Sequence, residues 1–310
     1  MRRTLATLAA VAAAAAPKNE TYAVLAYGRG GGATLGALVL GNVLRRVDPD
    51  RGRTALVYGI SDDAAAALRA GGWTVRPAAS FDTHHIDGDA ANELGKATAW
   101  PGRKLDLWRL PYAKVLYLDA DTMLVDHNET LRPALEGLWG TPLKKGGVGA
   151  LGTSAGCFNG GLLLLRPAAN TFDMYERALD ADLKKAACEG HDQPVLNRVF
   201  DGAWTNVHKT WRLLKVTQSC DRLEKAPDAV HFFAASAPWR GGCPACLARG
   251  LACSHRHGLR EAPCAQAPLL DAQRRWWREV EALPAAARGF VDGLLEGPPL
   301  TRDGAPRRLC

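Results

Sequence analysis

Short apolar runs alternate with longer amphipathic stretches between Tyr22 and about Phe233. The short runs are rich in Val, Leu and Tyr, as buried strands are, and the longer stretches repeat apolar residues at helical spacing. This alternation indicates an α/β fold with a mainly parallel sheet. The predicted strands are Tyr22–Tyr27, Thr54–Tyr58, Thr74–Val75, Lys114–Leu118 and Phe158–Leu165, and the predicted helices are Thr34–Val47, Asp62–Ala70, Lys104–Leu110, Ala168–Leu183 and Asp192–Phe200.

The pattern changes beyond Trp239, where Gly, Pro and Cys become frequent and one further helix is predicted, over Asp271–Leu283. We therefore predict a boundary near residue 240. The chain divides into a leader at residues 1–17, a main domain at residues 18–240 and a Cys-rich, partly helical C-terminal extension at residues 241–310.

The first residues have the layout of a signal or targeting segment: a basic start, an apolar stretch over Leu5–Ala16 and small residues before Pro17. The apolar stretch is too short to span a bilayer, and no later segment looks transmembrane. We expect the secretory pathway, in the Golgi or ER lumen, with a cytoplasmic or organellar location as the alternative. Eight cysteines fit an oxidising compartment.

Five of the eight cysteines lie in the extension. Four of them, together with two histidines, form a group that is compatible with either disulfides or a small zinc site. Its spacing matches no common zinc finger, and the leader favours disulfides. The group consists of Cys243, Cys246, Cys253, Cys264, His255 and His257.

The formal charge of +7 is spread along the chain, and no run of Lys and Arg exceeds two residues. A nucleic-acid-binding protein would concentrate such charge in a patch, so no nucleic-acid partner is predicted. The charge is mostly solvated surface, and some of it is available for a phosphorylated ligand.

The strongest local motif is Asp119-Ala120-Asp121, which directly follows the apolar strand Lys114–Leu118. Ligands of open α/β sheets collect at the carboxyl ends of the strands, where these two carboxylates stand. Hard divalent cations such as Mg²⁺ and Mn²⁺ share one or two carboxylates with substrate phosphates. The motif therefore predicts a metal held against a pyrophosphate, although Asp is also common in ordinary turns.

Three weaker motifs follow. A histidine after an apolar strand can be a third metal ligand, an Asn with two glycines can approach sugar hydroxyls, and polar groups at the head of a helix can bind a ligand or merely cap the helix. These motifs are Cys157-Phe158-Asn159-Gly160-Gly161-Leu162, Gly190-His191-Asp192-Gln193, and His231-Phe232-Phe233 with Pro238-Trp239.

In this order the four motifs resemble glycosyltransferase family 8, the glycogenin-like group of retaining nucleotide-sugar transferases. Ala23–Tyr27 is similar to the first strand of the family, and Lys104-Leu105-Asp106-Leu107-Trp108 is similar to its Lys-Leu-x-x-Trp helix. The resemblance runs from Tyr22 to Arg240. It implies a single Rossmann-like domain of the GT-A type with a mixed, mainly parallel sheet.

The resemblance also implies an activity: transfer of a hexose (glucose, galactose or glucuronic acid) from a UDP-sugar to a carbohydrate, inositol, lipid or protein hydroxyl, with Mn²⁺ or possible Mg²⁺ as cofactor. Carried over residue by residue, it assigns metal ligands, groups near the nucleotide and sugar, and catalytic residues. The metal ligands are Asp119, Asp121 and His231; the donor-binding residues are Leu25, Ala26, Tyr27, Ala120, Asn159, Gly160 and Trp239; the catalytic residues are Asp192, Gln193 and Lys104.

One departure from the family pattern concerns its closing motif, His-x-x-Gly-x-x-Lys-Pro-Trp. Here Ala234 and Ala237 replace its Gly and Lys. The lysine contacts the pyrophosphate in the family, and a hydrogen bond to a charged group contributes roughly 1.5 to 3 kcal/mol. The alternative function is therefore a weak or inactive transferase-like protein that binds a nucleotide-sugar or glycan.

A rival motif is Gly28-Arg29-Gly30-Gly31-Gly32-Ala33, which contains the Gly-x-Gly-x-x-Ala fingerprint of dinucleotide-binding folds after a strand and before a helix. The fingerprint also needs an acidic residue at the end of the second strand. That strand ends at Tyr58-Gly59 here, so the sequence favours the transferase.

Overall fold

The computed structural model describes most of the main domain and two helices of the C-terminal part. The described residues are 19–28, 31–78, 101–126, 129–143, 147–153, 156–168, 188, 193–208, 211, 213–215, 227–232, 237–241 and 266–296. The predicted leader, nearly all of the predicted helix Ala168–Leu183 and the Cys243–Cys264 group lie outside them. None of the described helices is both long and apolar enough to cross a membrane.

Among the described residues, seven strands form a mixed sheet in the order β3-β2-β1-β4-β7-β6-β8. Neighbours among β3, β2, β1 and β4 are parallel, β7 is antiparallel to both β4 and β6, and β6 is parallel to β8. The sheet is therefore mixed and mainly parallel, as predicted. Its strands are β1 (Glu20–Tyr27), β2 (Gly52–Tyr58), β3 (Thr74–Pro77), β4 (Lys114–Leu118), β6 (Val148–Gly152), β7 (Phe158–Leu165) and β8 (Trp204–Asn206).

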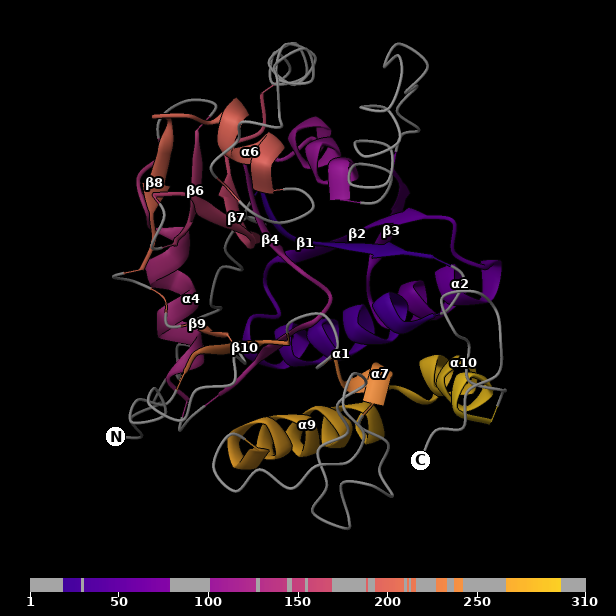
Figure 1. The fold of residues 1–310 in the computed structure, drawn as a ribbon. Helices are drawn as coiled ribbons and strands as arrows, with labels where there is room; N and C mark the ends of the chain where they lie inside the picture. The colour runs from indigo at the N-terminus through magenta and orange to yellow at the C-terminus, as the bar shows by residue number, and fades with distance from the viewer. Residues whose placement is uncertain are drawn as a thin grey trace, which may run out of the picture.

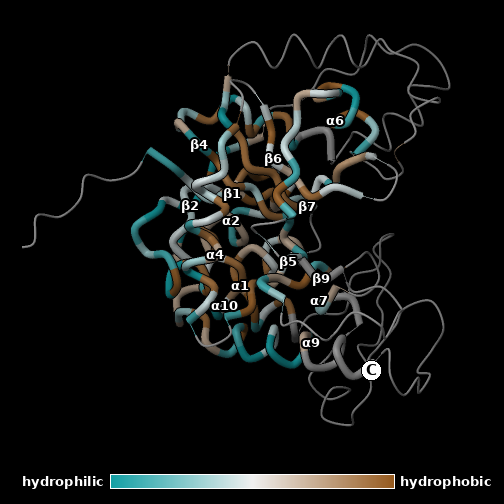
Figure 2. The backbone as a smooth tube through the Cα atoms, turned by 90° about the vertical axis from the view of Figure 1, so that its left-hand side faces the viewer, coloured by the Kyte–Doolittle hydropathy of each residue, from teal (hydrophilic) through white to brown (hydrophobic). Residues whose placement is uncertain are grey.

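Both faces of this sheet are covered, and its central strands are accordingly apolar along their whole length. All eight residues of β7 are buried, and β1, β7 and the helix α1 are prominent among the hydrophobic segments of Figure 2. Two hydrophobic clusters lie on opposite faces of the sheet. Helices α1 (Gly32–Val47), α2 (Asp62–Ala70) and α4 (Leu131–Trp139) contribute to one, and the 3₁₀ helix η1 (Pro101–Arg109) and α6 (Gln193–Val199) contribute to the other.

A second layer of helices packs beneath α1 and α2 and consists of α7 (Pro238–Gly241), α9 (Gln266–Glu281) and α10 (Ala285–Glu296) (Figure 1). Twelve of the sixteen residues of α1 are buried, because the sheet covers one side of the helix and α9 covers the other. A helix that is apolar on all sides is stable only when it is enclosed in this way. Trp276 and Val291 bring α9 and α10 into the same core cluster as the sheet.

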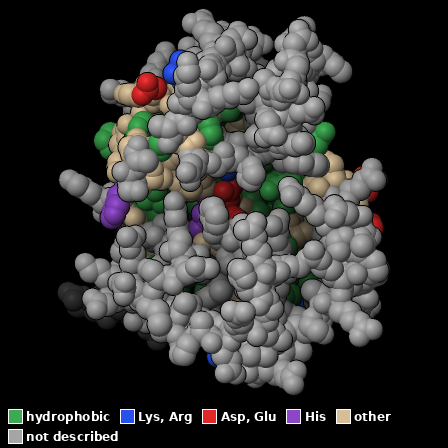
Figure 3. All heavy atoms as spheres, viewed as in Figure 1, with side chains coloured by type: hydrophobic (Ala, Val, Ile, Leu, Met, Phe, Trp, Pro, Cys, Tyr) green, Lys and Arg blue, Asp and Glu red, His purple; other side chains and the backbone are tan. Residues whose placement is uncertain are grey.

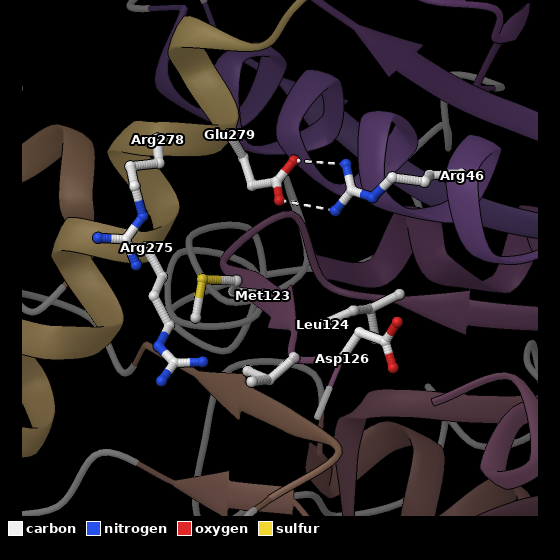
Figure 4. Close-up of a pocket in the computed structure, with 8 residues that line it drawn as sticks. Arg46, Met123, Leu124, Asp126, Arg275, Arg278 and Glu279 are labelled. Atoms are coloured by element: carbon white, nitrogen blue, oxygen red, sulfur yellow. Dashed lines mark hydrogen bonds and ion pairs between the residues drawn. The ribbon is translucent and has the colours of Figure 1, made fainter. Parts of the chain in front are cut away.

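An ion pair joins α9 to the end of α1 at the surface. The guanidinium of Arg46 donates two hydrogen bonds to the Glu279 carboxylate, at 2.8 and 3.1 Å. Beside the pair is a cavity of about 170 Å³ (Figure 4). Arg275 and Arg278 of α9 line this cavity, and Met123, Leu124 and Val125 contribute its apolar side chains.

A buried arginine, Arg51, joins three elements at the amino end of β1. Its guanidinium lies 2.7 Å from Glu20, 2.6 Å from Asp48 and 2.8 Å from Glu136, and its carbon lies 4.8 Å from the ring centre of Trp139. The side chain is only 2% exposed. Strand β1, the end of α1 and helix α4 are thereby held together by one cation.

The structure confirms the strands predicted in the main sheet and shifts or adds several other elements. The predicted helix Lys104–Leu110 is a 3₁₀ helix that begins at Pro101, and the predicted helix Asp271–Leu283 is α9. Helix α4 and helix α10 were not predicted. Pro133 stands in the first turn of α4, where a proline is tolerated, and Gly289 and Gly293 weaken the helical pattern of α10.

Candidate metal and sugar site

The two carboxylates of the Asp-Ala-Asp motif and His231 converge at the carboxyl end of β4. The motif forms a turn from β4 into β5 (Thr122–Leu124), with the Thr122 N–H donating to the Asp119 carbonyl at 2.9 Å. Strand β10 (Ala229–His231) pairs antiparallel with β5, which places His231 opposite Thr122. His231 Nε2 consequently lies 3.1 Å from Asp121 Oδ1 and 3.6 Å from Asp119 Oδ2.

These three side chains offer the ligands that the sequence predicts for a divalent metal. One ligand atom from each lies within 4.8 Å of the other two, and among the described residues they form a candidate metal-holding group. Two carboxylates with one imidazole suit Mn²⁺ or Mg²⁺, for which oxygen ligands are preferred. Acidic red atoms and a purple histidine lie together near the middle of the face in Figure 3. The donor set therefore fits the predicted metal.

Lys104 and Tyr117 both contact the first carboxylate. Lys104 Nζ lies 2.9 Å from Asp119 Oδ1 and donates to the Gly160 carbonyl at 3.0 Å, and the lysine side chain is 7% exposed. The Tyr117 hydroxyl donates to the same carboxylate. A buried ammonium needs such partners, since desolvation of an unpaired charge is costly. Lys104 thus contacts Asp119 from η1, the 3₁₀ helix on one face of the sheet.

The pKa of His231 reflects the same surroundings. Burial lowers the pKa of this imidazole, but the hydrogen bond with Asp121 and the negative charges of Asp121 and Asp119 outweigh burial, so the pKa stands above its ordinary value. A metal ligand must be the neutral ring, so a cation that binds here displaces the imidazole proton.

The opening residues of β7 and α6 form a polar group beside the carboxylates. Asn159 Nδ2 donates to Gln193 Oε1 at 2.9 Å, and Asn159 Oδ1 accepts from the Gly161 N–H at 2.9 Å. The Gly161 carbonyl in turn accepts from the Asp119 N–H at 2.9 Å. A hydrogen-bonded path therefore runs from Gln193 to the acidic motif. Asp192, the residue before α6, lies outside the described residues.

Gly161 is required by close packing against the histidine. A Cβ added there would lie 2.5 Å from His231 Cε1 and 2.9 Å from Asn159 Oδ1. His231 is 6% exposed, so its ring has little room to withdraw. Glycine is the residue that allows this approach.

We expect Gly161→Ala to weaken metal binding about 10- to 100-fold by displacing a ligand, and to lower the free energy of unfolding by about 1 to 3 kcal/mol through overpacking. Titration of Mn²⁺ by calorimetry, with chemical denaturation, measures both effects. Gly137→Ala is the matched control, because a Cβ at this helical glycine meets nothing within 4 Å; it should leave metal binding unchanged and add up to about 1 kcal/mol of stability. Equal metal affinity in both variants would refute the packing argument.

The residues predicted to hold the nucleotide lie at two neighbouring places. Leu25 and Ala26 at the end of β1 are buried, with side-chain contacts in the core, whereas Tyr27 is 41% exposed. The Ala120 carbonyl packs closely against Gly36 of α1. A Cβ added to Gly36 would lie only 2.2 Å from the Ala120 oxygen. Of these three β1 residues, Tyr27 is therefore the one with exposed surface at the end of the strand.

Trp239 packs against α1 rather than standing apart from the domain. A Cβ on Gly32 or Gly36 would lie 2.3 or 2.7 Å from its indole, and its ring centre lies 5.9 Å from that of Trp276. The indole thus fits a groove left by two glycines one helical turn apart. Ala237, which stands where the family pattern has lysine, is buried.

The cavity of Figure 4 contains none of the predicted site residues. It is lined by Met123 and Leu124 of β5 and by the two residues that follow, whereas the acidic motif precedes that strand. The side chains of Asp119, Asp121 and His231 are absent from its lining.

Two features of the site escaped the sequence reasoning. Asn197 of α6 bonds the backbone of β7, and a disulfide joins Cys157 to Cys188, one residue before β7 and five residues before α6. Asn197 follows Gln193 by one helical turn, so the sequence indicates that the two residues share a helix face, but it does not show the backbone that Asn197 bonds. The cysteines are 31 residues apart, and no spacing rule marks them as partners.

We expect Cys157→Ser/Cys188→Ser to lower the free energy of unfolding by about 2 to 4 kcal/mol, because the disulfide closes a long loop in the unfolded chain. Chemical denaturation with and without dithiothreitol measures this loss. The reductant should lower the free energy of unfolding more in the wild-type chain than in the double variant, where it can act only on other cysteines. An equal effect of reductant on the variant would assign the stability to other cysteines.

Comparison with known proteins finds glycosyltransferases. A model described as glycosyl transferase family 8 matches residues 103–243, just under half of the chain. A putative UDP-glucuronate:xylan alpha-glucuronosyltransferase 3 of Arabidopsis thaliana is 24% identical over 285 residues, which cover 89% of this chain and 42% of the relative. This chain thus spans less than half of the length of that plant protein.

Two solved structures share the fold. The galactosyltransferase LgtC, crystallised with donor and acceptor sugar analogs, superposes with a TM-score of 0.54 at 20% identity, over 87% of this chain and 99% of its own. The glycosyltransferase GlyE of Streptococcus pneumoniae gives a TM-score of 0.52 at 14% identity, over 92% of this chain and 66% of its own. The fold is the GT-A type that the sequence predicts.

The matched segment contains the acidic motif, His231, Lys104 and the Asn159–Gln193 pair. Family match, fold and the converging side chains agree with one another. Over residues 103–243, the part of the molecule that carries the candidate site, this chain is therefore similar to glycosyl transferase family 8.

Proposed function

We propose that this protein is a metal-dependent, retaining glycosyltransferase that moves a hexose from a UDP-sugar to a hydroxyl acceptor. The observation that carries the proposal is the convergence of Asp119, Asp121 and His231 at the carboxyl end of β4, next to the Asn159–Gln193 pair. Acidic ligands in that place suit a cation and a diphosphate, and the neighbouring amides suit sugar hydroxyls.

The chemistry follows from these groups. Asp119, Asp121 and His231 would hold Mn²⁺ or Mg²⁺, which would supply positive charge against the departing diphosphate. The bond from the anomeric carbon to the diphosphate breaks, the acceptor oxygen forms the new bond, and the proton of the acceptor hydroxyl passes to the departing diphosphate. Lys104 of η1 holds Asp119 in place through their ion pair.

The sugar end of the site is assigned to three polar residues. Asn159 and Gln193 are bonded to each other through one amide hydrogen, and amide side chains of this kind can donate to and accept from sugar hydroxyls. Asp192, adjacent in sequence to Gln193, is the carboxylate assigned to the reacting face. Asp192→Ala with donor binding intact and transfer unchanged would remove it from the mechanism.

For the nucleotide we assign the end of β1 and the Ala120 turn. Tyr27 is exposed where β1 ends, and Ala120 lies between the two acidic residues. Leu25, Ala26, Gly160 and Trp239 complete the assigned donor-binding set. The Cys157–Cys188 disulfide supports a place in the secretory pathway, since such bonds persist in oxidising compartments.

Glucose, galactose and glucuronic acid are the candidate sugars, and the relatives give reason to test two of them first. LgtC is named as a galactosyltransferase and the plant relative as a putative glucuronosyltransferase. Candidate acceptors are carbohydrate, inositol, lipid and protein hydroxyls.

The test is release of UDP from these UDP-sugars with Mn²⁺ or Mg²⁺, with and without acceptors, in the wild-type chain and in Asp119→Ala/Asp121→Ala. We expect release in the wild type that EDTA abolishes and Mn²⁺ restores. Release at the level of the double variant with every donor would reject the transferase.

A catalytically weak or inactive binder of nucleotide-sugar or glycan is the second candidate, and the buried Ala237 favours it because no charge reaches the pyrophosphate from that position. UDP binding in the presence of Mn²⁺ without UDP release would select this candidate. Binding together with release would reject it.

A further inference from the structure

Asn197, on the inner side of α6, bonds the backbone at the start of β7 with both ends of its side-chain amide. Its Oδ1 accepts from the Phe158 N–H at 2.7 Å, and its Nδ2 donates to the Phe158 carbonyl at 2.9 Å. The same Nδ2 also lies 2.8 Å from the Gln193 carbonyl. One amide therefore bonds both polar groups of a single strand residue and the first residue of α6.

The opening residues of β7 need such a partner because a strand flanks them on one edge only. Phe158 is opposite Gly152 of β6, and the register between β6 and β7 shifts only beyond Asn159. On the other edge, β7 pairs with β4 over Leu162–Leu165, and this pairing does not reach Phe158. Buried backbone groups need hydrogen-bond partners, and Asn197 supplies both for Phe158.

The residue after Phe158 is Asn159, whose amide reaches Gln193 in one direction and the Gly161 N–H in the other. Asn197 therefore contacts the residue before Asn159 and the backbone of Gln193 at the same time. Both side chains of the proposed sugar end are placed by elements that this amide joins. Asparagine suits the position, because its side chain carries an acceptor and a two-hydrogen donor in one plane.

We propose that Asn197 is a positioning residue of the transferase site: by bonding the Phe158 and Gln193 backbones it fixes Asn159 and Gln193 relative to each other. The proposal rests on the proposed function for its effect on transfer. Small displacements of positioning groups cost up to about a hundredfold in rate. Loss of this amide therefore lowers kcat and leaves the metal and nucleotide end of the site intact.

The structural part is tested without any turnover. In Asn197→Ala, hydrogen exchange measured by mass spectrometry should accelerate at least tenfold over residues 156–162, where the Phe158 N–H and the Gly161 N–H are protected through Asn197 and Asn159. Exchange in β1 should stay unchanged. If residues 156–162 exchanged in Asn197→Ala at the same rate as in the wild-type chain, the proposal would be overturned.

The catalytic part is tested by a double-mutant cycle. We expect Asn197→Ala to lower kcat about 10- to 100-fold and to leave the dissociation constants of UDP and Mn²⁺ unchanged. When Asn159→Ala is already present, the added Asn197→Ala should lower kcat by less than about threefold. A purely structural role predicts additive losses. Additive losses, or a UDP affinity that falls as much as kcat, would refute positioning.

Asn42→Ala is the matched control, since Asn42 is a buried asparagine that bonds Glu279 and Arg45 on the far side of α1. It should lower stability without altering kcat or exchange over residues 156–162. A wild-type chain without UDP release would reject the proposed function, and the exchange experiment would still decide whether Asn197 orders Asn159.

Discussion

Asp121→Asn is expected to lower metal-dependent transfer about a thousandfold while the fold is retained. The substitution keeps the shape of the side chain and removes the charge that attracts a divalent cation. A cation at a departing diphosphate contributes several kcal/mol to transition-state stabilisation, and about 4 kcal/mol corresponds to a thousandfold in rate. The Asp121 side chain is 26% exposed, and its backbone carbonyl keeps its bond from the Phe232 N–H, so stability should change little.

Nucleotide release at saturating Mn²⁺, together with a calorimetric Mn²⁺ titration, measures the effect. Asp126→Asn is the control, because this exposed aspartate follows in the same segment, outside the acidic site, and accepts from the Leu131 N–H. It should retain full transfer. If the two variants kept the same activity, Asp121 would not be a metal ligand.

Arg51→Met is expected to lower the free energy of unfolding by about 3 to 5 kcal/mol. The substitution leaves Glu20, Asp48 and Glu136 without their shared cation, and the Asp48 side chain is only 1% exposed. Removal of one partner from a buried ion pair costs this much, since an uncompensated charge stays inside the protein. Urea denaturation followed by circular dichroism measures the loss.

A second substitution separates charge from packing. Asp48→Asn added to Arg51→Met should recover part of the loss, because it removes the most buried carboxylate of the group. Arg132→Met, which breaks an exposed pair with Asp50, should cost less than about 1 kcal/mol. Equal losses of unfolding free energy in Arg51→Met and Arg132→Met would show that the buried ion pairs of Arg51 stabilise the fold no more than an exposed ion pair does.

The sequence predicts the parts of this fold that local pattern encodes. The strand Lys114–Leu118 is a continuous apolar run and appears as β4 with the same bounds. Strands β5 and β10 have three residues each, too few for a period to be visible. They form by pairing, and β10 pairs both with β5 and with β9 (Leu213–Lys215). Pairing between distant segments is a tertiary effect that propensity does not report.

The candidate site divides in the same way. Asp119 and Asp121 are recognisable from their place after a strand, whereas His231 came from the family resemblance, since a lone histidine carries no such mark. The partners of Lys104 could not be read from the sequence, because Gly160 contributes only its carbonyl. Asn197 was missed for a related reason: its role is to bond a backbone, and the sequence shows no partner for it.

The distance along the chain between Asp121 and His231, 110 residues, has a consequence for folding kinetics. A nascent chain that has not yet formed β10 offers a cation two carboxylates and no imidazole. Tight binding therefore begins only when the long-range pairing of β5 with β10 is complete, which is a late event in chains with many non-local contacts. Acquisition of Mn²⁺ during refolding should consequently report the last step of folding, and added metal should slow unfolding more than it accelerates folding.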